Sequence, residues 1–335
     1  MKNLFLTFFF IIISTYHMSA QQFKYFDYID KALKFYHEKN YQEAGKTFEL
    51  AFGSLHGKST QNNLYNSACS WSLAGNNDKT FLYLQKIIDG DMIDGWNDPI
   101  EFYQLLNKDS DFNNIKTDPR WKILTNGAKR NQESFQKNIR KDLAERIKIL
   151  GKSDQEKRLQ LDSLRKVKGL GFSGEKELLA IINRQDSINL IELDNIIKEF
   201  GWLGPKDIGY KNNQYLFLIV QHADLITQKK YMPLFKKAKK NGKILPKDIA
   251  YLEDRINMRE EKPQQYGSQV YPDVATKKFI LFPLKNVDSV DYYRASVGLE
   301  SLSSYLKSSF NIGWDPTVYK KELPVLQAKF LKKTE

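Results

Sequence analysis

Small and bulky apolar residues recur at a helical period between residue 23 and about residue 127, and the pattern itself repeats. Five positions reappear 36 residues later with apolar, aromatic or small side chains. Small residues let two helices approach closely, and large residues fill the groove between them. This repeat therefore predicts stacked pairs of helices. The first set is Ala32, Phe35, Ala44, Phe48 and Ala51, and its counterparts are Ala68, Trp71, Thr80, Leu84 and Ile87.

Two short turns and a less regular final stretch complete the predicted repeats. Residues 39–40 and 75–77 supply the turn within each helix pair. The stretch after them is interpreted as a degenerate third unit that caps the stack, with its last helix beginning at Asp118-Pro119. Terminal repeats are often atypical because one of their faces must meet water. The apolar residues of this third unit are Phe102, Leu105, Leu106, Phe112 and Trp121.

The corner Asn40-Tyr41-x-x-Ala44, with Phe48 and Ala51 after it, resembles the tetratricopeptide repeat family. The resemblance covers residues 25–90. In the second unit Asn77 and Thr80 replace the aromatic residue and the alanine that the family has there. The resemblance implies an α-α superhelical stack whose concave face binds a peptide or another protein, without identifying the residues that contact it.

Residues 128–168 have a different composition, dominated by charged residues and glutamine. Apolar residues nevertheless keep a helical spacing, which predicts a long amphipathic helix that links the two halves of the chain. Gly151 and Ser153 indicate a break in this helix, after which the helical pattern resumes. The apolar positions before the break are Ile139, Leu143, Ile147 and Leu150.

The C-terminal half combines helices with one short hairpin. Helices are predicted over residues 187–200, 228–240 and 246–259, the first of them ending at a glycine cap and the last beginning at a proline. Alternating apolar and polar residues predict paired strands at residues 265–271 and 278–284.

The predicted fold class is therefore mostly α. It comprises an N-terminal α-α superhelical repeat stack, a helical linker, and a C-terminal α-rich domain with a small β-hairpin. The expected boundaries are residues 1–20 for a signal peptide, 21–127 for the repeats, 128–168 for the linker, 169–312 for the α-rich domain and 313–335 for a C-terminal tail.

The N-terminus has the features of a secretory signal peptide. Lys2 precedes an apolar run over residues 4–13, and the small residues Ser19 and Ala20 follow. Cleavage after Ala20 would give an exported protein, periplasmic or extracellular; the alternative is a short uncleaved anchor or a buried helix. No later segment reaches the ~18 apolar residues of a membrane helix, so no transmembrane segment is expected in the mature chain.

The cysteine content indicates how the chain is stabilised, and the net charge indicates which classes of partner suit it. The formal net charge is +12, and Cys69 is the only cysteine. An exported chain with one cysteine has no internal disulfide and must be stabilised by packing. The positive charge suits an anionic envelope surface or an acidic partner, with a solvated lysine-rich surface as the simpler explanation. Nucleic acid is not expected as a partner of an exported protein.

Three motifs that could carry chemistry lack the context that this chemistry needs. Residues 169–174 match the glycine pattern of dinucleotide-binding proteins, but a charged helical stretch precedes them where a strand is required, so a flexible loop is predicted. His37, His56 and His222 are isolated from one another in the sequence, which predicts no metal site. Cys69 lies within a repeat helix and is expected to be buried. Neither a metal nor a cofactor is therefore expected.

Several short segments of the C-terminal half stand in a specific order and spacing. They are Asp186-x-x-Asn189-Leu190, Gly201-Trp202, Val220-Gln-His-Ala-Asp224, Gln228, Ala250-Tyr-Leu-Glu-Asp254-Arg255, Lys262-Pro-Gln264, Tyr266-Gly-Ser-Gln269, Val290-Asp291, Arg294 and Val297-Gly298-Leu299. This pattern resembles a bacterial family known only as a domain of unknown function. The resemblance spans residues 155–306, with Ser268 where many members have threonine and Tyr293 in place of a common arginine. It implies a domain boundary but no activity.

Two interpretations compete for the polar residues of this half. In the first, a pocket recognises a polar or anionic ligand, with His222 as a candidate acid or base and an arginine suited to a carboxylate. In the second, the same residues stabilise the fold: Asp224 caps a helix, and the glutamines shape the hairpin. The candidate ligand-binding residues are His222, Arg255, Gln264, Tyr266 and Gln269.

Two hypotheses about function follow from these patterns. The first is an exported protein-interaction scaffold that binds an unknown protein or peptide through its repeat face. The alternative is an envelope enzyme of hydrolytic type that uses the polar set around His222. The second requires His222 to be within reach of solvent and close to Arg255 or Tyr266, and burial of His222 against backbone carbonyls would remove its candidate.

Overall fold

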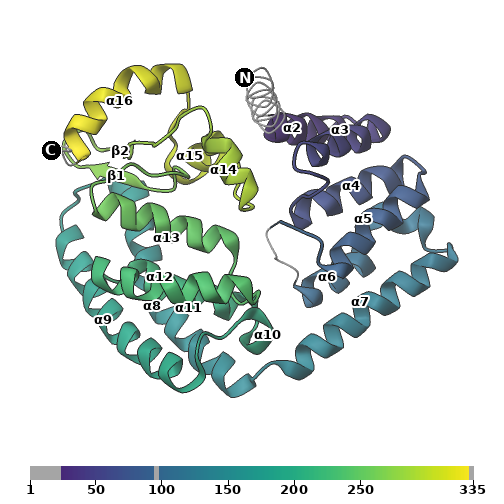
Figure 1. Cartoon of the computed structure of the whole chain (residues 1–335), viewed down its shortest axis with the longest axis horizontal. Helices are drawn as coiled ribbons and strands as arrows, with labels where there is room; N and C mark the ends of the chain where they lie inside the picture. The colour runs from purple at the N-terminus through teal and green to yellow at the C-terminus, as the bar shows by residue number, and fades with distance from the viewer. Residues whose placement is uncertain (1–23, 94–97, 332–335) are drawn as a thin grey trace, which may run out of the picture. The chain divides into compact units, whose positions relative to one another are not determined.

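Helices form most of the chain in the computed structural model, which describes residues 24–93 and 98–331 (Figure 1). The mostly α-helical fold class predicted from the sequence is confirmed. The expected signal peptide, residues 1–20, lies outside the described residues. None of the described helices is both long enough and apolar enough to cross a membrane.

The internal contacts divide the chain into two compact units. The first unit contains residues 1–133 and 288–305, and the second contains residues 134–287 and 306–335. The range expected as one α-rich domain, 169–312, is thus shared between the two units, because residues 288–305 pack with the first.

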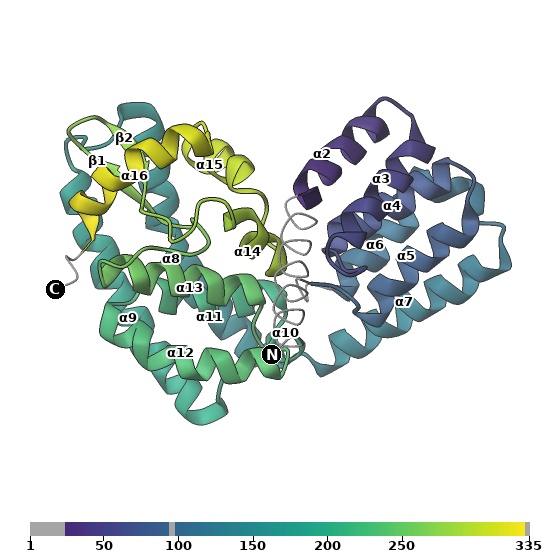
Figure 2. The same ribbon diagram turned by 45° about the horizontal axis from the view of Figure 1, so that its top comes forward.

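The first unit opens with two helix pairs, each joined by a short turn (Figure 2). Nine of the ten recurring positions are buried, and only Phe35 is partly exposed. The pairs meet closely, since a Cβ atom on Gly45 would lie 2.5 Å from the indole ring of Trp71. Seven of the ten recurring side chains belong to one apolar core. The four helices are α2 (Lys24–His37), α3 (Tyr41–Gly53), α4 (Gln61–Leu73) and α5 (Asn77–Asp89).

Further elements extend the same apolar core. Phe102, Phe112 and Leu124 are buried in it, as is Ala295 from much later in the chain. Ala295 belongs to a short helix that packs against α2. The elements are α6 (Pro99–Lys108), the 3-10 helix η1 (Ser110–Ile115), α7 (Pro119–Asn138), which begins at the predicted proline and continues into the second unit, and α14 (Val290–Ser296).

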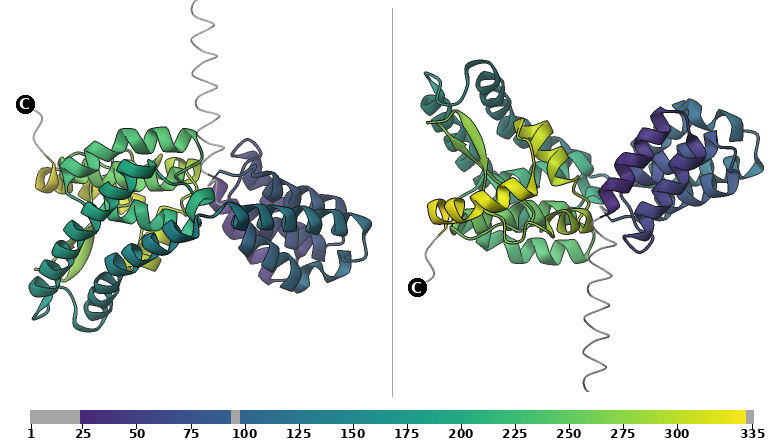
Figure 3. Two further views of the ribbon diagram at one scale, coloured as in Figure 1. Left: turned by 90° about the horizontal axis from the view of Figure 1, so that it is seen from below. Right: turned by 90° about the horizontal axis from the view of Figure 1, so that it is seen from above.

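The second unit is built on long helices (Figure 3). Its core joins side chains from most of them, including Ile147, Leu193, Leu216, Phe235 and Leu252, which are fully or almost fully buried. The helices are α8 (Lys141–Lys168), α9 (Glu175–Phe200), α10 (Pro205–Ile208), α11 (Tyr210–His222), α12 (Leu225–Lys240) and α13 (Pro246–Arg259).

The predicted break in the linker helix is wrong, because α8 continues through Gly151 and Ser153. Gly151 is instead a point of close approach: a Cβ atom there would lie 1.9 Å from the ring of Tyr215 on α11. Ser153 stays helical by donating its hydroxyl to the carbonyl of Leu150. The glycine serves the packing of two helices and not a turn.

The hairpin is shorter than predicted. β1 (Val270–Asp273) pairs antiparallel with β2 (Lys278–Leu281). Residues 265–269 were expected in the first strand, but several of their backbone N–H groups bind a side chain of α13 and not a neighbouring strand.

The C-terminal segment expected as a tail contains a helix that packs on this hairpin. It is α16 (Pro316–Phe330), which follows α15 (Leu302–Phe310). The Phe330 ring lies 5.1 Å from that of Tyr271 and 5.5 Å from that of Phe282, measured between centroids. Lys329 also pairs with Asp273 at 3.6 Å. The segment is therefore part of the second unit.

Candidate polar site

A histidine–aspartate pair lies within a group of polar side chains in the second unit. His222 is the last residue of α11, and Asp154 lies on α8. The Nδ1 atom of His222 lies 3.0 Å from Oδ1 of Asp154. The side chain of Asp154 is 1% exposed and that of His222 is 15% exposed. The histidine is therefore held by a buried carboxylate while part of its ring reaches the surface.

Two further charged residues, Arg158 and Asp186, lie next to this pair. Arg158, one turn along α8, lies with its Nε atom 3.7 Å from Oδ2 of Asp154 and also binds Asp186 of α9. Gln155 donates a hydrogen bond of 2.6 Å to Asp154. The group brings two negative charges, one positive charge and an imidazole together from three helices. We call His222, Asp154, Asp186 and Arg158 the His–Asp cluster.

The environment defines the protonation of this cluster. Burial lowers the pKa of His222, and the opposing effect of Asp154 does not restore it. Burial also disfavours ionisation of Asp154, but its hydrogen bond with His222 and the charge of Arg158 oppose this effect, and the pKa of Asp154 lies below its ordinary value. The pair is thus a carboxylate and a neutral imidazole near pH 7.

A carboxylate can only accept a hydrogen bond, so the proton of the neutral imidazole sits on Nδ1 of His222. Its Nε2 atom then carries a free lone pair. Among the described residues, no hydrogen-bond partner of Nε2 is found. An imidazole held in this tautomer by a carboxylate is suited to accept a proton from a bound molecule.

The same atoms could be considered as metal ligands. The donor atoms of Asp154, Asp186 and His222 lie within 4.8 Å of one another. Arg158, however, already contacts both carboxylates. A guanidinium in this position supplies the charge that a divalent cation would bring, so the donor set fits an ion-pair network better than a preformed metal site.

The other predicted site residues surround a different carboxylate, that of Asp254, which is fully buried on α13. It accepts backbone hydrogen bonds from Gln265, Tyr266 and Ser268, and one from the Ser268 hydroxyl. Gln264 binds the backbone of Gln269 through both ends of its amide, donating at 3.0 Å and accepting at 2.8 Å. These residues hold the loop before the hairpin onto α13.

Two arginines of α13 have different surroundings. Arg255, a predicted ligand-binding residue, lies half-buried beside Asp254 in the sequence. Arg259 donates a hydrogen bond to the carbonyl of Ala223, directly after His222, and feels the charges of Asp224 and Asp186. Burial lowers the pKa of Arg259, against the effect of both carboxylates. Arg259, and not Arg255, is therefore the arginine that contacts the residue directly after His222.

Asp224 occupies the N-cap position of α12 and accepts a hydrogen bond of 2.7 Å from the backbone N–H of Thr227. Hydrogen bonds from Thr227 hold the pKa of Asp224 below its ordinary value. This cap turns the chain sharply after His222 and so fixes the end of α11 at which the histidine lies.

A second polar group lies in the first unit. Tyr65 donates a hydrogen bond of 2.8 Å to Asp109, and the Sγ atom of Cys69 lies 3.8 Å from the same carboxylate. Tyr36 binds Asp111. Burial and the two carboxylates raise the pKa of the Cys69 thiol far above its ordinary value. Cys69 is thus a buried, protonated thiol and not an activated nucleophile.

The second unit is consequently a helical domain with a buried carboxylate that orients a partly exposed histidine. A family model described as a family of unknown function, DUF6624, matches residues 142–311. The match covers half of the chain, and the chain belongs to this family. Asp154, Asp186 and His222 all lie within the matched region. No curated protein and no solved structure matches the chain.

Proposed function

We propose that the chain is an exported interaction scaffold whose first unit is a tetratricopeptide-like stack that binds a protein or peptide. The observation that carries the proposal is the burial of nine of the ten repeated positions in the two helix pairs with which the first unit begins. Stacks of this kind present extended surfaces to partners, since each pair contacts only its neighbours and leaves one side open. Export rests on the N-terminal pattern of charge, apolar run and small residues.

Photocrosslinking from defined positions tests this proposal. Asn62 on α4 and Gln85 on α5 are both exposed, and they lie on different helices of one pair. A photoreactive phenylalanine analogue would replace each of them in the full-length chain, expressed in its own host. We expect one helix to crosslink a single protein reproducibly and the other to give only background.

The crosslinked protein would then be purified and mixed with the mature chain. Saturable binding that is lost when the crosslinking surface of the stack is mutated supports the scaffold proposal. Equal background crosslinking from both positions, or no binding between the purified proteins, contradicts it.

A second candidate function is general acid–base catalysis in the second unit, which would make the chain an envelope enzyme of hydrolytic type. The specific support is the hydrogen bond of 3.0 Å between His222 and Asp154, together with the partial exposure of the histidine. In this mechanism Asp154 keeps the proton on Nδ1. The Nε2 atom takes a proton from water as it attacks the substrate, and Asp154 stabilises the imidazolium that forms. The imidazolium then returns the proton to the leaving group as the scissile bond breaks.

Substitutions that keep the shape of the pair test this second function. His222→Gln and Asp154→Asn would be introduced into the host chromosome, with His37→Gln, an exposed histidine of the first unit, as the control. We expect His222→Gln to reproduce the phenotype of a complete deletion while the protein remains folded. Asp154→Asn should be intermediate, because it alters only the tautomer and orientation of the imidazole. A normal phenotype for folded His222→Gln would rule out this function.

A further inference from the structure

Two adjoining cavities occupy the face of the second unit formed by the hairpin, the end of α15 and α16. The smaller has a volume of about 270 Å³ and the larger about 840 Å³. Phe279, Ile312 and Gly313 line both of them. The two cavities therefore adjoin along these three residues, and the larger one alone is within the usual size range of small-molecule sites.

The larger cavity is strongly cationic. Arg165, Lys166, Lys277 and Lys278 line it, against a single acidic residue, Asp162. Arg165 is neutralised by Glu175, which its Nη2 atom approaches to 2.5 Å. None of the three lysines forms an ion pair with any part of the chain that the structure describes. With Asp162 counted against the three lysines, a net charge of +2 remains around one hollow and attracts an anion.

Polar and aromatic groups lie among these charges. Ser309 and Asn311 also line the larger cavity, beside the rings of Phe279 and Phe310. The two rings make an edge-to-face contact with centroids 5.2 Å apart, joining β2 to the end of α15. A hydroxyl and an amide can donate hydrogen bonds to an anionic group, while the rings offer an apolar boundary to whatever carries it.

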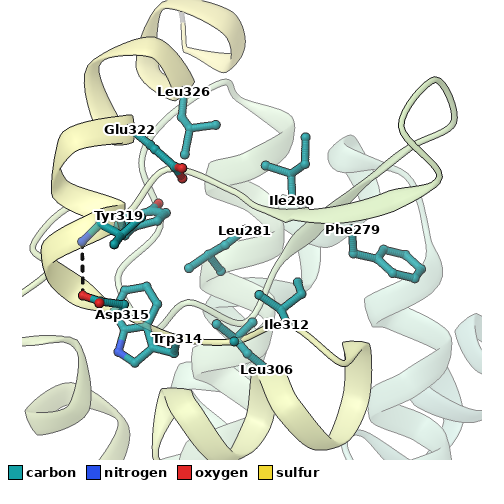
Figure 4. A pocket seen from close by; sticks show the side chains of 12 residues that line it. Phe279, Ile280, Leu281, Leu306, Ile312, Trp314, Asp315, Tyr319, Glu322 and Leu326 are labelled. Carbon is teal, nitrogen blue, oxygen red and sulfur yellow. Dashed lines mark hydrogen bonds between the residues drawn. The ribbon is translucent and has the colours of Figure 1, made fainter.

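The smaller cavity is an apolar slot (Figure 4). Figure 4 shows Ile280 and Leu281 of β2 on one side of it, Leu306 and Ile312 on another, and Leu326 on α16 above them. These side chains present hydrocarbon to the slot and favour a hydrocarbon group packed against them, while the carboxylates of Asp315 and Glu322 line its α16 side.

The α16 side of the slot is a fixed wall. The hydroxyl of Tyr319 donates to the carbonyl of Phe282 and accepts from the N–H of Leu284, both at 3.1 Å. The Trp314 ring packs against Tyr319 with centroids 5.2 Å apart. These contacts hold α16 at a distance from β2, and the slot is thus preformed.

We propose that these cavities form a binding site for a small anionic amphiphile, with its charged head among Lys166, Lys277 and Lys278 and its hydrocarbon tail in the slot. The charges define the orientation. Asp315 and Glu322 line the slot, and their carboxylates repel an anionic head from that end, whereas the three lysines attract it to the other. The proposal is independent of the repeat unit and of the His–Asp cluster.

Isothermal titration of the full-length mature chain with monomeric laurate, below its micelle concentration, tests the site. Lys277→Glu combined with Lys278→Glu should weaken laurate binding by at least about tenfold. Lys239→Glu combined with Lys240→Glu introduces the same change in charge at exposed positions of α12 and should leave binding within about twofold of the original. Val318→Trp, at a half-exposed position that lines the slot, should abolish tail binding.

Three other probes distinguish the sources of binding. Inorganic phosphate tests the head alone, lauryltrimethylammonium tests the tail alone, and anionic phospholipid vesicles test a membrane surface. We expect laurate to bind more tightly than phosphate and than the cationic amphiphile, and to do so without vesicles. The proposal is overturned if phosphate binds as tightly as laurate and Val318→Trp has no effect, if both amphiphiles bind equally, or if only vesicles bind.

Discussion

Asp248 shows how strongly burial can act on a single residue. It lies in the first turn of α13 with only 1% of its surface exposed, and Gln214 donates a hydrogen bond of 2.7 Å to it. Burial raises the pKa of Asp248 to about 7, although the charge of Lys247 and the bond from Gln214 act in the opposite direction. A carboxyl group of this kind is protonated in the folded chain and ionised in the unfolded chain over several pH units.

The first prediction concerns the pH dependence of stability. Between the unfolded pKa near 4 and the folded pKa of about 7, the folded state binds the proton and the unfolded state does not. The contribution of Asp248 to the free energy of unfolding therefore falls as pH rises through this window. The gain in the free energy of unfolding from Asp248→Asn should be larger at pH 8 than at pH 5, by up to roughly 3 kcal/mol. Urea unfolding at several pH values measures this.

The matched control is Asp162→Asn, a carboxyl exposed on α8. The free energy of unfolding of this variant should change with pH in the same way as that of the original chain. If the free energy of unfolding of Asp248→Asn also changes with pH as that of the original chain does, the buried carboxyl does not titrate in this window. Other groups, including His222, also shift on folding, so only the difference between variants isolates Asp248.

At the same scale, the His–Asp cluster was only partly predictable from the sequence. His222 was identified, and so were Asp186 and Asp224 as members of the family pattern. Asp154 was not, because it precedes His222 by 68 positions on another helix. Only the packing of α8 against α9 and α11 brings these side chains together, and no local spacing encodes that. Gln264 and Gln269 illustrate the converse, since their amides are used by the loop itself.

At the scale of elements, the sequence predicts where helices exist better than where they begin. The helix expected at residues 187–200 is α9, which starts at Glu175 directly after a glycine with positive φ. That glycine belongs to the loop 169–174, whose three glycines lie in the left-handed region and which links α8 to α9. A helix precedes the loop and not a strand, so the dinucleotide motif lacks its required context.

The second prediction concerns the contact between α8 and α11. Gly151→Ala would place a Cβ atom 1.9 Å from the Tyr215 ring, so the two helices must separate. The free energy of unfolding should fall by at least about 2 kcal/mol. Gly127→Ala is the control, because its Cβ would meet no atom closer than 3.9 Å. In the interior of α7 that change should be neutral or stabilising by up to about 1 kcal/mol.

Chemical denaturation followed by circular dichroism would compare the two alanine variants. Tyr215→Ala in the Gly151→Ala background should recover part of the lost stability, since it removes the ring that the new methyl group meets. Equal effects of Gly151→Ala and Gly127→Ala would mean that Gly151 is not a packing contact.

At the scale of the whole molecule, the family match and the compact units begin and end at different residues. The match ends at residue 311, whereas residues 288–305 pack with the first unit. Ala295 is 2% exposed in the same core as Tyr25 and Ile29 of α2. No pattern in the sequence predicts this, because α14 is too short to carry a periodic signal. The first unit therefore depends on a segment that lies in the chain between the two parts of the second unit.

The third prediction follows from this dependence. Ala295→Asp places an unpaired carboxylate in the core of the first unit, at a cost of several kcal/mol. Hydrogen exchange measured by mass spectrometry should accelerate in α2 and α3, which lie far from residue 295 in the sequence. Ser296→Asp, at the exposed neighbouring position, should leave exchange in both helices unchanged. Faster exchange confined to residues 288–305, with α2 unaffected, would show that α14 is peripheral and that the repeat unit is stable without it.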